Sequence, residues 1–305
     1  MSIPEPLAGT AAPEEPEEPP VRQSTPFLVL QFFIFPLSIV AACVAVFVVF
    51  GMIASEGKGA REHLADVRTG GANRRWQAAF ELAKVLQAGK DPALTDPGFT
   101  GEVAKVFEEA SADDPRVRRY LALALGRMGD RRAVPALLKA VDDAATNGSR
   151  SDPETQVYAV WALGVIADPQ AAPRLVTLAK HDDAGLRKAA VHALGAFPGE
   201  ASREALVIAL SDPVTDVRWN AAVALARRRD GAAVPVLLGM MDRAELAGVP
   251  GLTDEQRAGA MVQAVQAAAV LHDAGLDQAV RKLRDSDPDL KVRQAAHAAT
   301  QPLQR

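Results

Sequence analysis

A short helical motif recurs through most of this 305-residue chain, and it constrains the fold more than any other feature. Two clear copies read Val-Arg-Arg-Tyr-Leu-Ala-Leu-Ala-Leu-Gly at 117–126 and Val-Arg-Trp-Asn-Ala-Ala-Val-Ala-Leu-Ala at 217–226. Aligned copies share a marker position, with steps of 43, 38, 31, 31, 46 and 29 residues between Leu82, Leu125, Leu163, Leu194, Leu225, Leu271 and Thr300. A unit of about 30 residues with insertions is typical of a helical solenoid.

Each unit also carries signals that start and stop a helix. Asp-Pro pairs begin at Asp114, Asp152, Asp212 and Asp287, where the carboxylate can cap a helix whose first residue is proline. Apolar residues between these signals fall at helical spacing, and no segment alternates as a strand does. We therefore predict an all-α fold, an α-solenoid of helix pairs.

The motifs resemble the HEAT-like repeats of phycobilin lyases and related bacterial proteins, over residues 70–300. In that family the arginine after the valine pairs with the aspartate of the following turn. The resemblance therefore implies a structural ladder of Arg118 with Asp130 and Arg218 with Asp230, interrupted where Tyr158 replaces the arginine. It implies the architecture and leaves the function open, because solenoids of one architecture host unrelated activities.

Two segments of different character precede the repeats. Residues 1–26 hold seven prolines, five glutamates and one base, a composition that predicts a disordered acidic tail. Residues 27–54 contain no charge and exceed the roughly 20 apolar residues that cross a bilayer, so we predict one transmembrane helix there. The remaining boundaries are a juxtamembrane linker at 55–72 and the solenoid at 73–305.

The apolar segment has two other interpretations. A cleaved signal peptide has a short basic start and an apolar core of about 7–15 residues, which this long segment behind an acidic tail does not match. The run at 40–43 resembles the lipobox of bacterial lipoproteins, so lipidation of Cys43 stays an alternative, although apolar residues follow it.

Bases flanking the apolar segment predict its orientation. Three follow it and one precedes it: Lys58, Arg61 and Arg68 against Arg22. Because lysine and arginine accumulate on the cytoplasmic side, we expect a single-pass protein of the cell (inner) membrane with a cytoplasmic solenoid.

Charge and chemistry exclude several classes of function. The net charge of the chain, −4, equals that of the tail, so residues 27–305 balance to zero, whereas nucleic-acid binding needs a basic excess. The repeats contain no cysteine, and none of the five histidines precedes a glutamate, unlike the His-Glu dipeptides of the HEAT-like enzyme deoxyhypusine hydroxylase. Phosphate-binding loops and hydrolase elbows are also missing. We predict a protein without catalytic residues, metal, cofactor, nucleic-acid partner or small-molecule substrate.

One position of the repeat varies in a way that suggests a binding surface. The site of Trp219 is filled in other copies by apolar and by charged residues, which indicates exposure on the second helix of each pair, the inner face of a solenoid. Candidate protein-binding residues are therefore Trp76, Arg119, Lys188 and Trp219. The alternative is that each indole covers its own neighbouring helix.

These observations favour a membrane-anchored scaffold for protein–protein interactions. We expect its partners to be integral membrane proteins, with the chain an accessory subunit of a respiratory, photosynthetic or transport complex. Two alternatives remain open: a bilin lyase or chaperone, as the resemblance implies, and a free-standing membrane adaptor that recruits soluble partners.

Overall fold

The computed structural model describes residues 34–54, 58–112, 114–146 and 152–301, and all regular elements in these ranges are helices. This confirms the all-α fold class. The chain divides into two units, Met1–Gly57 and Lys58–Arg305.

The first unit contains helix α2, Phe35–Ala54. The predicted acidic tail and residues 27–33 of the predicted transmembrane segment lie outside the described residues. Within the described ranges, none of the helices has both the length and the apolar character needed to cross a membrane.

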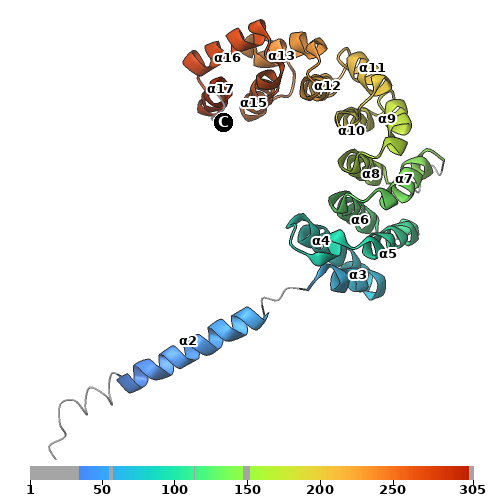
Figure 1. Cartoon of the computed structure of the whole chain (residues 1–305), viewed down its shortest axis with the longest axis vertical. Helices are drawn as coiled ribbons and strands as arrows, with labels where there is room; N and C mark the ends of the chain where they lie inside the picture. The colour runs from blue at the N-terminus through green and yellow to red at the C-terminus, as the bar shows by residue number, and fades with distance from the viewer. Residues whose placement is uncertain (1–33, 55–57, 113, 147–151, 302–305) are drawn as a thin grey trace, which may run out of the picture. The chain divides into compact units, whose positions relative to one another are not determined.

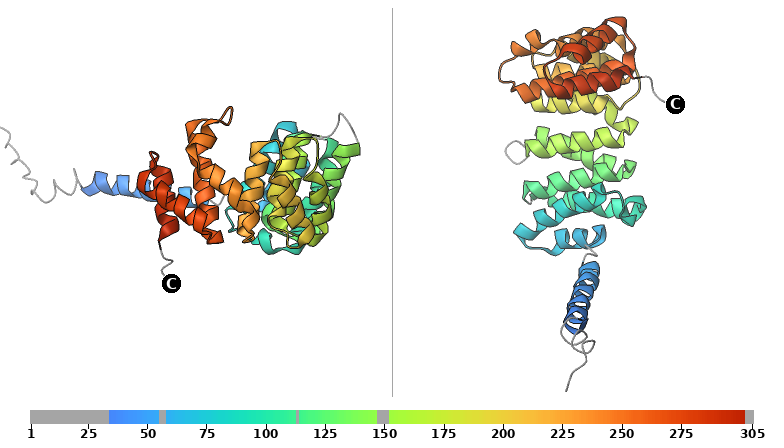
Figure 2. Two further views of the ribbon diagram at one scale, coloured as in Figure 1. Left: turned by 90° about the horizontal axis from the view of Figure 1, so that it is seen from above. Right: turned by 90° about the vertical axis from the view of Figure 1, so that its left-hand side faces the viewer.

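The second unit is a solenoid of seven helix pairs in the residues that the structure describes. The outer helices are α3 (Ala60–Thr69), α5 (Pro97–Glu109), α7 (Val134–Thr146), α9 (Ala172–Leu178), α11 (Glu200–Ala209), α13 (Val234–Met241) and α16 (Ala274–Ser286). The inner helices are α4 (Ala72–Gln87), α6 (Pro115–Met128), α8 (Pro153–Ile166), α10 (Ala184–Leu194), α12 (Thr215–Arg227), α15 (Asp254–Leu271) and α17 (Leu290–Thr300). The inner helices line the concave side of an arc (Figure 1), and the pairs stack as layers (Figure 2). Each marker residue of the repeat lies in an inner helix, so the periodicity is confirmed.

Glycine at the end of the Ala-Leu-Gly motif sets how closely the inner helices approach. A Cβ atom at Gly164 would lie 2.7 Å from the Cβ atom of Ala193 in the next inner helix. One at Gly126 would lie 2.8 Å from the Trp161 ring, and one at Gly195 would lie 3.0 Å from the Cβ atom of Ala224. Contacts this short leave no room for a methyl group, so glycine is required for the observed spacing.

The predicted linker at 55–72 is wrong over most of its length, because α3 belongs to the solenoid. Ala60, Leu64 and Val67 are buried against α4 and join the hydrophobic core. Their spacing of four and three residues forms a single apolar stripe, narrow enough to be hidden among the charged residues of this helix. The described solenoid therefore starts at Lys58 and not at residue 73.

The helix starts follow the sequence signals in two of four cases. Asp114 and Asp152 cap α6 and α8, each with a proline at the first helical position, as predicted. Asp212 and Asp287 also accept a hydrogen bond from the amide two residues later, but there the bond closes a turn, and α12 and α17 start only at Thr215 and Leu290.

Candidate protein-binding surface

The arginine that follows the valine of the motif stabilises the turn of its own repeat. In Arg187, Arg218 and Arg293, the Nη1 atom donates to the backbone carbonyls five and six residues earlier, at 2.6–3.1 Å. These carbonyls belong to the turn that leads into the same helix. Three repeats thus share one way of fixing the entry of the inner helix.

The implied pairing of Arg218 with Asp230 is wrong. Arg218 lies nine residues before the end of α12 at Arg227, about 13 Å along the helix axis, and Asp230 lies in the turn beyond that end, out of reach of the arginine side chain. Asp230 instead accepts from Arg203 of α11 at 2.5 Å. The other implied pair is also engaged differently, since Asp130 binds Arg132 at 2.8 Å and the Arg118 guanidinium lies 4.9 Å from the centre of the Phe107 ring.

A second set of arginines, which shares Arg187 with the first, connects the repeats. Arg119, Arg187 and Arg243 each bind, through Nε and Nη2, both carboxylate oxygens of the aspartate in the turn of the next repeat, at 2.6–3.1 Å. The aspartates are Asp152, Asp212 and Asp287. Hydrogen bonds from Arg119 and Arg187 lower the pKa values of Asp152 and Asp212. These bidentate pairs tie one turn to the next.

The four candidate binding residues lie on inner helices, but neighbouring side chains already engage them. Arg119 is committed to its bidentate pair, and Lys188 binds Asp216 of α12 at 2.6 Å. Trp76 is half-buried beneath the guanidinium of Arg116, 4.3 Å from the ring centre. The structure therefore places these residues at contacts between repeats and does not gather them into one open patch.

The side chains one helical turn beyond the candidate residues, on the same inner helices, are more open. Phe80 is 42% exposed, and the Tyr120 ring meets it edge-on with 5.2 Å between ring centres. Leu123 lies beside both, and Trp161 and the 46% exposed Val165 continue the surface on α8. We call Phe80, Tyr120, Leu123, Trp161 and Val165 the aromatic patch. Outer helices cover the opposite side of α4, α6 and α8, so the patch faces the concave side (Figure 1).

A groove between α4 and α6 opens within the aromatic patch. Its volume is about 170 Å³, and its lining comprises Phe80, Ala83, Lys84, Gln87, Tyr120, Leu123 and Arg127. The guanidinium of Arg127 also lies over the Trp161 ring, 5.0 Å from its centre. Arg127 therefore links the groove to the α8 part of the patch.

Sequence reasoning missed the aromatic patch because the column looks like core. Phe80, Leu123, Trp161, His192 and Val223 occupy equivalent positions, and a column that is apolar in all but one repeat normally indicates burial. A usable signal was the size of the residues, since two bulky aromatic side chains stand where other repeats carry leucine, histidine, valine or alanine.

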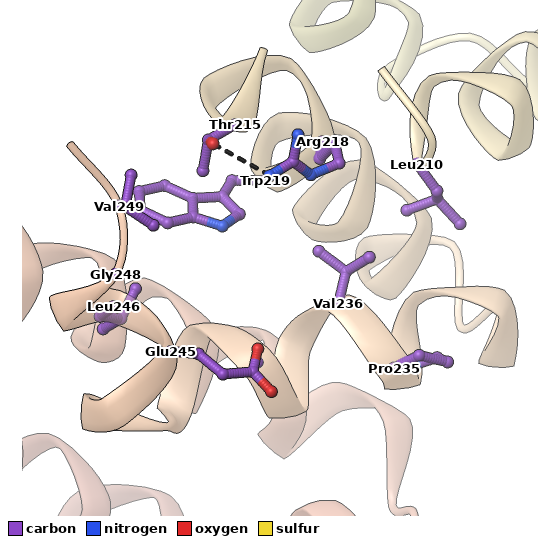
Figure 3. Close-up of a pocket in the computed structure, with 11 residues that line it drawn as sticks. Leu210, Thr215, Arg218, Trp219, Pro235, Val236, Glu245, Leu246, Gly248 and Val249 are labelled. Atoms are coloured by element: carbon purple, nitrogen blue, oxygen red, sulfur yellow. Dashed lines mark hydrogen bonds between the residues drawn. The ribbon is translucent and has the colours of Figure 1, made fainter. Parts of the chain in front are cut away.

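A second hollow lies beside Trp219, where α12 meets α13 and the short helix α14 (Arg243–Ala247). This Trp219 pocket has a volume of about 530 Å³. The indole lies against Val249, and Glu245 lies across the pocket from it (Figure 3). Arg218 stands at the rim, where its Nη2 atom donates to the Thr215 hydroxyl at 2.9 Å. The half-buried Trp219 thus lies against side chains of the next repeat.

Metal chemistry has no evident location in this surface. Within the described ranges, no group of three or more histidine, cysteine, aspartate or glutamate side chains is placed to hold a metal ion.

The fold and surface define an α-solenoid of HEAT-like repeats. Residues 147–226 match the model for HEAT repeats, and residues 117–143 match the model for the PBS lyase HEAT-like repeat.

One solved structure supports the fold. The complex of CpcE and CpcF of phycocyanin lyase from Nostoc sp. PCC7120 is 19% identical, covering 81% of this chain and 97% of that chain with a TM-score of 0.52. Human deoxyhypusine hydroxylase is 18% identical, covering 79% of this chain and 95% of that chain with a TM-score of 0.32. Among curated proteins, no sequence matches the chain significantly.

Proposed function

We propose that this chain is a scaffold that binds a partner protein on the concave face of its solenoid. The observation that carries the proposal is the aromatic patch, where the exposed Phe80 and Val165 and the half-buried Tyr120, Leu123 and Trp161 form an apolar surface over three adjacent inner helices. Exposed apolar patches on soluble domains commonly mark protein interaction sites, and aromatic residues dominate the binding energy of interfaces.

We propose that this scaffold works at the membrane, with residues 27–54 as the single-pass anchor and the solenoid in the cytoplasm. Support comes from the uncharged segment and from the flanking bases. A chain built in this way would be an accessory subunit that holds components of a larger integral membrane complex, such as a respiratory, photosynthetic or transport assembly.

Co-purification tests the scaffold directly. The full chain is extracted from membranes in mild detergent, and the proteins that accompany it are identified by mass spectrometry. We expect integral membrane proteins that are lost with the Phe80→Glu variant and retained with Glu204→Gln, a change on the exposed outer helix α11. A chain that purifies at its own mass would favour the adaptor for soluble partners.

Thiol labelling tests the orientation. A cysteine placed at the exposed Glu204 should resist a membrane-impermeant maleimide in intact cells and react after permeabilisation. Labelling in intact cells would place the solenoid outside the cytoplasm. Recovery of the chain in the soluble fraction would overturn the anchor.

A bilin lyase or chaperone is the second candidate, because the match at 117–143 and the phycocyanin lyase complex both point to it. Incubation of the purified chain with a bilin would then give a stable complex with shifted tetrapyrrole absorbance. An unshifted spectrum, together with no transfer to an added acceptor protein, would remove this candidate.

A further inference from the structure

The groove of the aromatic patch has a charge asymmetry that indicates its ligand. Two of its seven lining residues, Lys84 and Arg127, are basic and none is acidic. Among the described residues, no carboxylate pairs with Arg127. Lys84 binds Glu81 at 3.3 Å, but both side chains are largely exposed, and such surface pairs contribute little. The groove therefore presents apolar surface beside cations that are available to a ligand.

From this asymmetry we infer that the aromatic patch binds an extended acidic segment of a partner protein, in which carboxylates flank an apolar side chain. This inference rests on the proposed scaffold function and names the chemistry of its partner. The apolar side chain enters the groove beside the contacting rings of Phe80 and Tyr120, and the carboxylates bind Lys84 and Arg127.

The size of the groove favours one side chain of a peptide over a small molecule. Pockets that enclose small molecules measure roughly 300–1,000 Å³. At about 170 Å³, this groove is below that range. The surface around it continues across α4, α6 and α8, so a ligand that uses the whole patch must run across the helices.

The spacing of the repeats predicts the spacing of the carboxylates. Lys84 and Arg127 occupy equivalent positions, each two residues after the marker leucine of its repeat. Neighbouring helix axes lie about 8–10 Å apart, and an extended chain advances about 3.3–3.6 Å per residue. The two carboxylates should therefore lie about three residues apart, and about six residues should span the patch.

Peptide selection tests this inference with the full chain in detergent. A library of random decapeptides displayed on phage is selected on the immobilised protein, and enriched peptides are resynthesised with a fluorescent label. We expect enriched sequences to carry two acidic residues about three positions apart around an apolar residue. The double variant Lys84→Glu, Arg127→Glu should weaken their binding at least 30-fold, and Phe80→Ala should weaken it about tenfold. Ile208→Ala, on the outer helix α11, should leave it unchanged.

Several outcomes would overturn the inference: enrichment of basic peptides, no enrichment, or equal binding by the charge-reversed variant. Loss of self-association in that variant would also overturn it, because the occupant would then be a second copy of the chain. Circular dichroism and thermal melting confirm that each variant is folded. If acidic peptides fail to bind but membrane partners still require Phe80, the proposed scaffold function stands and only this inference is overturned.

Discussion

Two hollows of the solenoid, the groove of the aromatic patch and the Trp219 pocket, are built from the same repeat and differ in what surrounds them. At the groove, consecutive inner helices pack directly against each other, and Phe80 stays exposed beside the half-buried Tyr120. At the pocket, the inserted helix α14 and its loop place Leu246 and Val249 beside Trp219. An aromatic residue thus becomes a binding surface or part of a local core according to the length of the neighbouring connection. The experiments below test this contrast.

The largest effect should come from the close contact between inner helices. Gly164→Ala should lower the free energy of unfolding by about 1–3 kcal/mol, because the new methyl group would lie 2.7 Å from Ala193. Gly259→Ala in α15 is the matched control, since nothing lies within 4 Å of its Cβ position. The control should gain about 0.5–1 kcal/mol from the better helix former. Urea denaturation measures both, and equal effects would show that close packing does not set the spacing.

The two tryptophans should separate binding from stability. Trp161→Ala should weaken partner binding by about 2 kcal/mol, since its indole belongs to the aromatic patch. Trp219→Ala should instead lower the stability by about 2 kcal/mol, below the 3–5 kcal/mol of a fully buried tryptophan. Thermal melting beside quantitative co-purification compares them. The contrast between the hollows fails if Trp219→Ala abolishes partner binding without loss of stability.

The ion pair of Arg187 with Asp212, which lies between the two hollows, should give a stabilisation that depends on pH. Arg187 lowers the pKa of Asp212, so the stabilisation is present above the unfolded value near 4 and is lost as pH falls through the lower folded value. Asp212→Asn should cost about 1–2 kcal/mol at pH 7, and the difference from wild type should shrink below pH 4. Asp216→Asn, whose partner Lys188 is half exposed, should cost less than about 0.5 kcal/mol. A pH-independent cost would assign the effect to the lost turn geometry.

The smallest effect concerns Arg127 alone. Arg127→Gln should weaken partner binding by about 0.5–1 kcal/mol at low salt, as expected for one exposed cation beside an aromatic ring. The loss should disappear at about 0.5 M salt, where exposed charges are screened. Isothermal titration at two salt concentrations measures it. An effect that survives high salt would mean that Arg127 acts by packing against Trp161.

The inner helices could be predicted because each carries its own periodic apolar face and its own stop signal. Leu82 to Thr300 marked all seven of them. The outer helix α3 was not predicted because only three apolar residues identify it. The aromatic patch was not predicted for another reason. Whether Phe80 is covered depends on a neighbouring repeat, and the sequence around Phe80 does not indicate that contact.

The arginine pairs show that side-chain contacts implied by a family resemblance cannot always be transferred to this chain residue by residue. Arg218 was expected to reach a turn at the far end of its helix, and it holds the near turn instead. The helix length alone excludes the first arrangement. The bidentate partners of the turn aspartates lie elsewhere in the sequence, at Arg119, Arg187 and Arg243, outside any single repeated position.

The turn held by its own arginine bears on how such an array can change over generations. Because Arg187, Arg218 and Arg293 each fix the turn of the repeat that encodes them, a duplicated repeat brings its own means of starting its inner helix. A copied gene segment therefore keeps this contact, and only the bidentate pairs, such as Arg187 with Asp212, also need a matching aspartate in the neighbouring repeat. The inserted α14 occupies a connection that these contacts do not use, so a lineage can lengthen that connection and acquire a new pocket while the array persists.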